Sequence, residues 1–405
     1  MSEKKVKRKL KGHKPPMSKL VRESAKEVGL YPYFLPVTGE QAHTVDINGK
    51  ETVMLGSNNY LGMTEHPDVK DAAIKAIEKY GVGCTGSRYL NGTLDIHLNM
   101  EDLLAEFMGN ESALMFSSGY HTNVGTLYSL ASREDTILSD AYNHASIVDG
   151  CRLSQAEIVV YKHNDPESLR ESISSLPEER GALCITDGVF SMEGDIANLP
   201  PLKKICQEED VFLMVDDAHS IGVMGKNGRG TASHYGIDVD LTMGTFSKSL
   251  ASQGGFISGD HDVIDDIKHS ARSLIFSAAP PPANVATAKK SLEIFMEDDS
   301  YRQKLWKNAS YLKKGLKDIG FDIGHTDSPI IPVIIGLDAT TMGYWHELLE
   351  RGIYTNPVIY PATPRDRCLL RNSVMATHTT DDLNQALDAY EEVLEVIPLD
   401  DDEDE

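Results

Sequence analysis

The sequence LTMGTFSKS at 241–249 joins a short apolar run to a turn that carries hydroxyl groups and a lysine. A short apolar run of this kind is typical of a buried parallel strand. In open α/β sheets, ligands bind beyond the carboxyl ends of such strands, where the Lys248 amine is placed to form an imine. Thr245 and Ser247 add short donors suited to a phosphate. We therefore predict a cofactor site at Lys248.

Similar apolar runs recur along the chain and alternate with longer segments of helical periodicity. The predicted strands are 113–116, 136–138, 158–161, 183–186, 212–215, 241–243 and 255–258. In residues 67–80, Val69, Ala73 and Ile77 recur at helical spacing, which predicts a helix with one core face. This alternation predicts an α/β fold with a large, mostly parallel sheet covered by helices.

A run of three prolines at 280–282 interrupts this pattern. A helical stretch is expected at 284–316, followed by strands at 330–335 and around Ile353, with covering helices at 344–350 and 382–394. This composition predicts a smaller C-terminal α/β domain. The expected division is an N-terminal arm (1–45), a large cofactor-binding domain (46–290), a small C-terminal domain (291–396) and an acidic tail (397–405).

Composition excludes several classes of protein. The formal net charge of −23 argues against a nucleic-acid partner, because such binding needs a basic face that displaces counterions. The excess of acidic residues is also compatible with adaptation to high salt. No apolar stretch approaches the roughly 18 to 20 residues that span a bilayer, and no secretory signal is evident, so we expect a cytoplasmic protein.

Two further features concern metals and membranes. The five cysteines have neither C-x-x-C pairs nor metal-ligand spacing, so no metal site is expected. The N-terminal arm carries a cluster of cations at Lys4, Lys5, Lys7, Arg8, Lys9 and Lys11. This arm either makes a peripheral contact with anionic lipid or is a solubilising terminus.

An acidic pair follows the predicted strand 212–215, in the sequence VDDAHS at 215–220. A pyridoxal ring acts as an electron sink only while its ring nitrogen stays protonated, and a buried carboxylate beside that nitrogen holds the proton. Asp216 is our candidate for this carboxylate. His219 either hydrogen-bonds the ring hydroxyl or imine region, or is an ordinary loop residue.

Two other turns follow predicted strands. The sequence SSGY at 117–120 places small residues before a helical segment, where backbone amides at a helix N-terminus bind phosphate well. The sequence NHAS at 143–146 offers the His144 imidazole for stacking on a flat ring. It also reads as a helix cap by Asn143 or Ser146, and both interpretations can hold together.

Taken in series, these motifs resemble the α-oxoamine synthases of the fold-type I aminotransferase superfamily. The resemblance runs from about residue 31 to residue 394 and includes DGVFSMEGD at 187–195. Within that family the chain is most similar to the soluble bacterial serine palmitoyltransferases. The segments that carry this likeness are GSNNYLGMT at 56–64, GSRYLNGT at 86–93, PATP at 361–364, LLR at 369–371 and ATHT at 376–379.

The resemblance implies pyridoxal 5'-phosphate (PLP) as cofactor and assigns catalytic roles to four residues. Lys248 would hold PLP as a Schiff base, Asp216 would pair with the pyridine nitrogen, and His144 would stack on the ring. His219 would contact the ring oxygen. Further cofactor contacts are expected from Ser118, Gly119, Tyr120, Ser191, Thr245, Ser247 and Ser277, and substrate contacts from Asn58, Asn59 and Arg371.

The implied reaction is the decarboxylative condensation of L-serine with a long-chain acyl-CoA such as palmitoyl-CoA, which gives 3-ketodihydrosphingosine. Arg371 would grip the amino-acid carboxylate. The family also implies a homodimer with shared active sites, in which residues 276–278 reach the partner's phosphate. A catalytically silent subunit is a competing interpretation, but Lys248, Asp216 and His144 are all present.

Three positions depart from the family pattern. Ala278 and Asp217 stand where a hydroxyl residue and a glutamate are common. Ile359 stands where a second, carboxylate-holding arginine is often found, and Arg365 and Arg367 lie close by in sequence. Cysteate, alanine or glycine therefore remain alternative amino-acid substrates.

Overall fold

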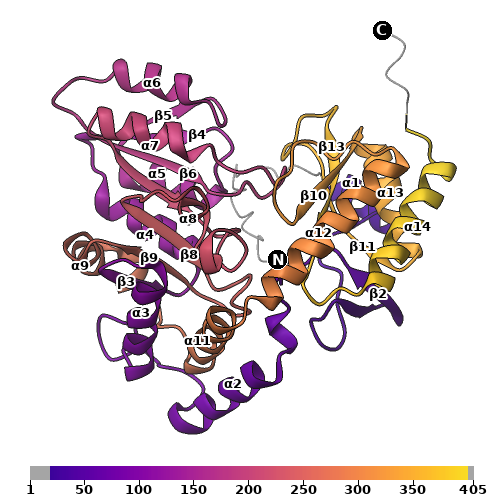
Figure 1. The fold of residues 1–405 in the computed structure, drawn as a ribbon, viewed down its shortest axis with the longest axis horizontal. Helices are drawn as coiled ribbons and strands as arrows, with labels where there is room; N and C mark the ends of the chain where they lie inside the picture. Colours follow the sequence, from indigo (N-terminus) through magenta and orange to yellow (C-terminus); the bar gives the residue numbers. More distant parts are fainter. Residues whose placement is uncertain (1–18, 400–405) are drawn as a thin grey trace, which may run out of the picture.

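A seven-stranded sheet forms the centre of the larger part of the molecule (Figure 1). In this computed structural model, which describes residues 19–399, its strand order is β3-β9-β8-β7-β6-β4-β5. Only β9 runs antiparallel to its neighbours. The strands are β3 (Ser112–Phe116), β4 (Asp135–Asp140), β5 (Glu157–Tyr161), β6 (Gly181–Asp187), β7 (Phe212–Asp216), β8 (Leu241–Thr245) and β9 (Gly255–Gly259).

Helices cover both faces of this sheet because successive strand residues point to opposite sides. Ile137 packs with helices on one face and Leu138 with helices on the other. The first face carries α4 (Gly119–Leu130), α5 (Ala145–Ser154), α9 (His261–Ser270) and α10 (Arg272–Ile275). The second carries α6 (Pro166–Ser174), α7 (Leu199–Glu208) and α8 (Thr231–Tyr235).

Two three-stranded sheets lie in the smaller part of the molecule, called here the C-terminal part because most of it comes from the C-terminal segments (Figure 1). Their orders are β1-β2-β11 and β10-β13-β12. The strands are β1 (Thr44–Ile47), β2 (Lys50–Met54), β10 (Ile330–Gly336), β11 (Ile353–Tyr354), β12 (Asn356–Val358) and β13 (Cys368–Ser373). The remaining helices are α1 (Lys19–Glu27), α2 (Pro67–Tyr80), α3 (Asp95–Met108), α11 (Pro282–Glu297), α12 (Ser300–Ile319), α13 (Asp338–Glu350) and α14 (Thr380–Val396), with 3-10 turns η1 (Met63–Glu65) and η2 (Lys226–Gly228).

The α/β fold and all seven predicted strands of the large sheet are confirmed. The division into domains stays a prediction; β2 pairs with β11, which joins the start of the predicted large domain to the C-terminal part. The basic arm at 4–11 lies outside the described residues, as does the tail from residue 400 on. No helix between residues 19 and 399 is long and apolar enough to cross a bilayer.

Two local predictions differ in detail from the structure. The helical stretch expected at 284–316 is confirmed, and it is divided into α11 and α12 at a turn where the Asp298 carboxylate accepts hydrogen bonds from the amide and hydroxyl of Ser300. The core face of α2 is narrower than predicted. It buries Val69 and Ala76, whereas Ile77 is 42% exposed. α2 packs against α11.

A buried ion pair ties the loop at 86–93 to the main sheet. The Arg88 guanidinium donates to both carboxylate oxygens of Glu101 on α3, at 2.8 and 2.9 Å. One of these oxygens also accepts from the Met115 amide of β3 at 2.9 Å. Both side chains are almost fully buried. Each charge is therefore shielded from water and is stabilised by the opposite charge of its partner.

Replacing Glu101 by Ala leaves the Arg88 charge buried without a partner. We expect the free energy of unfolding to fall by about 3–5 kcal/mol, as measured by chemical denaturation. The matched control is Asp71→Ala in the exposed Lys75–Asp71 pair on α2, because water solvates the Lys75 charge once the carboxylate is removed. A change of similar size in Asp71→Ala and Glu101→Ala would contradict this account.

Candidate active site

The ends of four parallel strands and one helix N-terminus meet around a cavity of about 150 Å³. Asp187 ends β6 and Asp216 ends β7, while Lys248 lies three residues beyond β8. The cavity is lined by Gly119, Tyr120, Asn123, His144, Ser146, Asp187, Val189, Ser191, Asp216, Ala218, His219, Met243, Thr245, Ser247 and Lys248. The turns singled out in the sequence therefore meet in one place.

Lys248 lies beside two carboxylates. Burial lowers the pKa of its amine to about 8, although the negative charges of Asp216 and Asp187 oppose the shift. A larger fraction of the amine is therefore neutral near neutral pH, and only a neutral amine attacks an aldehyde. Burial, followed by the charge of Asp216, raises the pKa of Asp187 well above its usual value.

Hydrogen bonds hold Asp216 from two sides. One oxygen accepts from the Ala218 amide at 2.9 Å, and the other accepts from the Asn123 side-chain amide at 2.7 Å. Sequence reasoning missed Asn123. It lies four residues after Gly119 and therefore on the same face of α4, so a polar residue at that helical spacing was the available signal.

His144 both caps α5 and lines the cavity. The predicted cap residue was wrong, because the cap is His144 itself and neither Asn143 nor Ser146. Its Nδ1 lies 3.2 Å from the Ser146 amide and 2.7 Å from the Ser146 hydroxyl. The His144 amide donates to Asp187 at 3.2 Å. Burial lowers the pKa of His144, with an opposing effect from Asp216. A neutral, firmly oriented imidazole lies beside the cavity.

His219 is oriented by a residue that the sequence did not single out as a site residue. The Tyr60 hydroxyl lies 2.7 Å from its Nδ1, and both side chains are buried. Burial lowers the pKa of His219 well below its usual value, and the positive charge of Lys248 adds to the effect. Tyr60 thus fixes one nitrogen of a neutral imidazole and leaves the other for a ligand.

The N-terminus of α4 faces the hydroxyl pair after β8. The Ser118 hydroxyl caps α4 by accepting from the His121 amide at 3.1 Å, and Ser118 itself does not line the cavity. At Gly119 a Cβ atom would lie 2.9 Å from Thr245 Oγ1, so only glycine permits this approach. Thr245 and Ser247 hydroxyls lie 2.9 Å apart. The backbone amides at the N-terminus of α4 and these two hydroxyls together form a cradle suited to binding a phosphate group.

Arg371 on β13 reaches toward the same region from the C-terminal part. Its guanidinium donates to the Ser191 carbonyl and to Asn58 Oδ1, the latter at 3.0 Å. Ser373 Oγ accepts a third hydrogen bond at 2.7 Å. Arg371 is 6% exposed. A buried guanidinium without a carboxylate among these partners is suited to an anionic substrate group.

Several predicted contacts lie apart from the cavity. Asn59 turns away and donates to the Thr64 hydroxyl at 2.7 Å. Ser277 follows the exposed Phe276 and does not line the cavity. Arg365 lies over the Tyr360 ring, 4.1 Å from its centroid, and is exposed.

Asp217 belongs to a separate buried network. Its carboxylate accepts from the hydroxyls of Ser220 and Thr231, both at 2.6 Å, and from the Thr231 amide at 2.9 Å. Burial raises the pKa of Asp217 to about 6, although these hydrogen bonds oppose the shift. The aspartate at this position therefore stabilises the fold beneath the cavity.

The residues present fit PLP. An amine at Lys248 matches the aldehyde, the buried Asp216 carboxylate matches a protonated ring nitrogen, and the α4 cradle matches the phosphate. The cavity also holds polar atoms that lack a hydrogen-bond partner within the described chain, namely Asn123 Oδ1 and Asp187 Oδ1. Among residues 19–399 no cluster of acidic, histidine or cysteine side chains is arranged to hold a metal.

Comparisons with known proteins identify the family of this chain. Residues 50–389 match the family model described as aminotransferase class I and II. The serine palmitoyltransferase of Sphingobacterium spiritivorum is 50% identical, over 90% of this chain and 92% of its own. The 8-amino-7-oxononanoate synthase of Thermoanaerobacter pseudethanolicus is 42% identical, over 92% and 95%.

The fold is similar to that of a high-resolution structure of SPT with PLP internal aldimine. The TM-score is 0.91 at 37% identity, covering 94% of this chain and 97% of that one. The chain belongs to the class I and II aminotransferase family, and within it to the PLP-dependent α-oxoamine synthases.

Neighbouring aspartates give a matched test of the site. Asp216→Asn removes the charge that would hold a proton on the ring nitrogen of PLP, so turnover should fall roughly a hundredfold while the fold is retained. Asp217→Asn weakens only the buried network, so the unfolding free energy should fall by about 1–3 kcal/mol with turnover of the folded enzyme kept. Steady-state kinetics and denaturation of both variants check this. Equal kinetic losses in the two would contradict the assignment.

Proposed function

We propose that this enzyme condenses L-serine with a long-chain acyl-CoA, palmitoyl-CoA in the simplest case, and releases CO2 and CoA. The product would be 3-ketodihydrosphingosine, the first intermediate of sphingolipid synthesis. The observation that carries the proposal is the buried Arg371 guanidinium, which donates to the carbonyl of the cavity-lining Ser191 and supplies a receptor for an amino-acid carboxylate. The 50% identity to a serine palmitoyltransferase supports the choice of serine.

Each residue has a distinct task in this proposal. PLP, when bound, supplies an electron sink for the pair released at the substrate Cα. Asp216 holds the proton on the ring nitrogen, and His144 supports the ring through its face. The neutral His219 offers its free nitrogen to the ring oxygen, while Tyr60 fixes the orientation of the imidazole.

Arg371 and Lys248 act on the amino acid itself. A bidentate contact from Arg371 to the carboxylate fixes the rotation about Cα, so that the Cα–H bond faces the Lys248 amine. The lowered pKa of Lys248, about 8, suits an amine that takes this proton as a general base. The acyl group is transferred to Cα as the thiol leaves, the carboxylate departs as CO2, and a proton is then added to Cα to give the amino ketone.

Cysteate is the second candidate substrate, which would make the enzyme a cysteate fatty acyltransferase producing a sulfonolipid base. It is favoured by Ile359, which stands where a second arginine is often found, and by the exposed Arg365 nearby. Alanine or glycine with another acyl thioester is the third, supported by the 42% identity to an 8-amino-7-oxononanoate synthase. Absorbance titration of the holoenzyme with each amino acid, followed by assay of thiol release, separates these candidates. Productive binding of cysteate but not serine would overturn the proposal.

Arg371→Lys keeps a positive charge but loses the planar, bidentate donor pair. We expect the dissociation constant for serine to rise about tenfold or more. The matched control is Arg351→Lys, because Arg351 pairs with Glu347 and Glu392 on the surface. Absorbance titration measures both. Unchanged serine affinity in Arg371→Lys would remove the proposed carboxylate receptor.

A homodimer with shared active sites is part of the proposal. An antiparallel bridge between Ser87 and Ala278 brings two exposed segments together. Leu90 in one is 78% exposed and Phe276 in the other is 71% exposed. Large apolar side chains gathered at one surface are typical of a protein interface, and Ser277 there would be free to reach a partner's phosphate. The cytoplasmic location and the lipid contact of the basic arm stay predictions.

The dimer has a direct test. Light scattering should give the molar mass of two chains, and Leu90→Asp should shift the protein toward one chain by burying a charge in the interface. Leu337→Asp, at a position 57% exposed in the C-terminal part, is the control and should leave the mass unchanged. A single-chain mass for the wild type would refute the dimer.

A further inference from the structure

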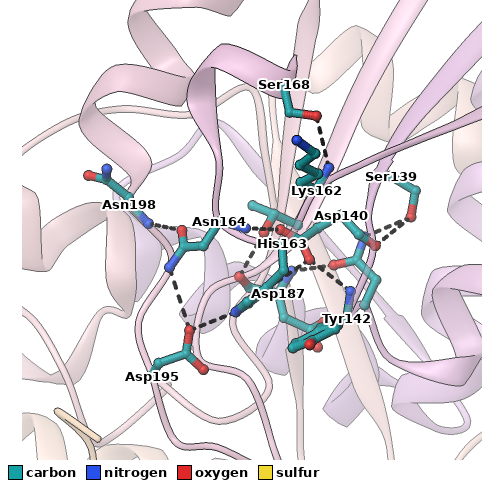
Figure 2. Close-up of polar contacts among 12 residues, drawn as sticks. Ser139, Asp140, Tyr142, Lys162, His163, Asn164, Ser168, Asp187, Asp195 and Asn198 are labelled. Atoms are coloured by element: carbon teal, nitrogen blue, oxygen red, sulfur yellow. Dashed lines mark hydrogen bonds and ion pairs between the residues drawn. The ribbon is translucent and has the colours of Figure 1, made fainter. Parts of the chain in front are cut away.

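His163 lies between the carboxylates of Asp140 and Asp195 (Figure 2). His163 follows β5, and its Nδ1 lies 3.0 Å from Asp140 at the end of β4. Its Nε2 lies 3.0 Å from Asp195 in the loop after β6. A neutral imidazole has only one N–H group, so only the protonated ring donates to both carboxylates.

Aromatic rings enclose this imidazole. The Tyr142 ring stacks on it, with centroids 4.1 Å apart and planes 15° apart. Phe190 meets it edge-on at 4.4 Å. The side chain of His163 is 22% exposed, and that of Asp140 is fully buried. An ion pair enclosed in this way is rigid and poorly screened by solvent.

The two carboxylates belong to the two segments that form one wall of the site. We define the His144 turn as residues 140–144 and the Ser191 loop as residues 188–195. Asp140 also accepts from the Tyr142 amide at 2.8 Å, which shapes the His144 turn. Asp195, through its carbonyl, accepts from the Phe190 amide at 3.0 Å, which closes the Ser191 loop.

Each of the two segments carries a group of the proposed site. The His144 turn carries the imidazole beside the cofactor cavity. The Ser191 loop presents the carbonyl that accepts from Arg371 Nε. Asn164 adds a second link, since it donates to the Ile196 carbonyl at 2.9 Å and its own amide donates to Asp140 at 2.8 Å.

We propose that His163 is a positioning residue for this site, acting as an imidazolium cross-link between the His144 turn and the Ser191 loop. It touches neither cofactor nor substrate. It acts through the orientation of His144 and through the carbonyl that steers Arg371. The inference rests on the proposed function, because its main readout is amino-acid binding.

The cross-link depends on pH. Burial lowers the pKa of His163, but the hydrogen bonds and charges of Asp140 and Asp195 outweigh it and raise the pKa to about 9. Glu193 on the same loop is a further carboxylate near this ring, and the Tyr142 and Phe190 rings are the aromatic groups that face it. Because the folded pKa is raised, the stabilisation is complete below the usual histidine pKa of about 6.5. It is lost as the pH rises through about 9.

The test compares the holoenzymes of wild type, His163→Gln and Asp195→Asn. We expect His163→Gln to raise the dissociation constant for serine about tenfold at neutral pH and to abolish its further rise near pH 9. Asp195→Asn keeps the imidazole but removes one carboxylate, so the alkaline rise should move to lower pH. His269→Gln, which alters an exposed histidine paired with Asp265, is the control.

A second readout is independent of the cofactor. In the apo-protein, the difference in unfolding free energy between wild type and His163→Gln should shrink as the pH rises through about 9. A purely structural histidine would lower stability without changing the serine dissociation constant or its pH profile, and that result would overturn the proposal. If the wild type itself binds no serine, the proposed function fails instead, and the two failures are distinguishable.

Discussion

The Asp216 carboxylate is buried at the end of β7, and a buried charge is tolerated only where protein groups replace water. Asn123 and the Ala218 amide supply two hydrogen bonds, and Lys248 supplies a cation nearby. Each of these comes from a different element. The carboxylate can lie there only if α4, the turn after β7 and the turn after β8 are all in place.

The need of a buried carboxylate for hydrogen-bond partners also explains why the adjacent Asp216 and Asp217 have different surroundings. Asp216 faces the cavity, where a ligand completes its surroundings. Asp217 faces the protein, where Ser220 and Thr231 satisfy it. Alternation along an extended chain sends these neighbours in opposite directions. In the proposed function, Asp216 serves the cofactor chemistry, whereas the hydrogen bonds of Asp217 stabilise the turn after β7.

Much of this arrangement is predictable from sequence because the decisive signals are local. Apolar runs marked the seven strands, and residues that follow strands fell at the carboxyl edge, as Lys248 and His144 did. The pairing of β2 with β11 was missed because it joins segments about 300 residues apart. Tyr60 was missed for the same reason, since only the fold brings it to His219. Asn59 shares a motif with Asn58, but local sequence does not show which amide turns inward.

The central claim is that Lys248 carries the cofactor. The most direct measurement is borohydride reduction of the holoenzyme followed by peptide mapping with mass spectrometry. A phosphopyridoxyl group on the peptide containing Lys248, and on no other lysine in stoichiometric amount, is the predicted result. An unlabelled Lys248 in an enzyme that still contains PLP would contradict the account.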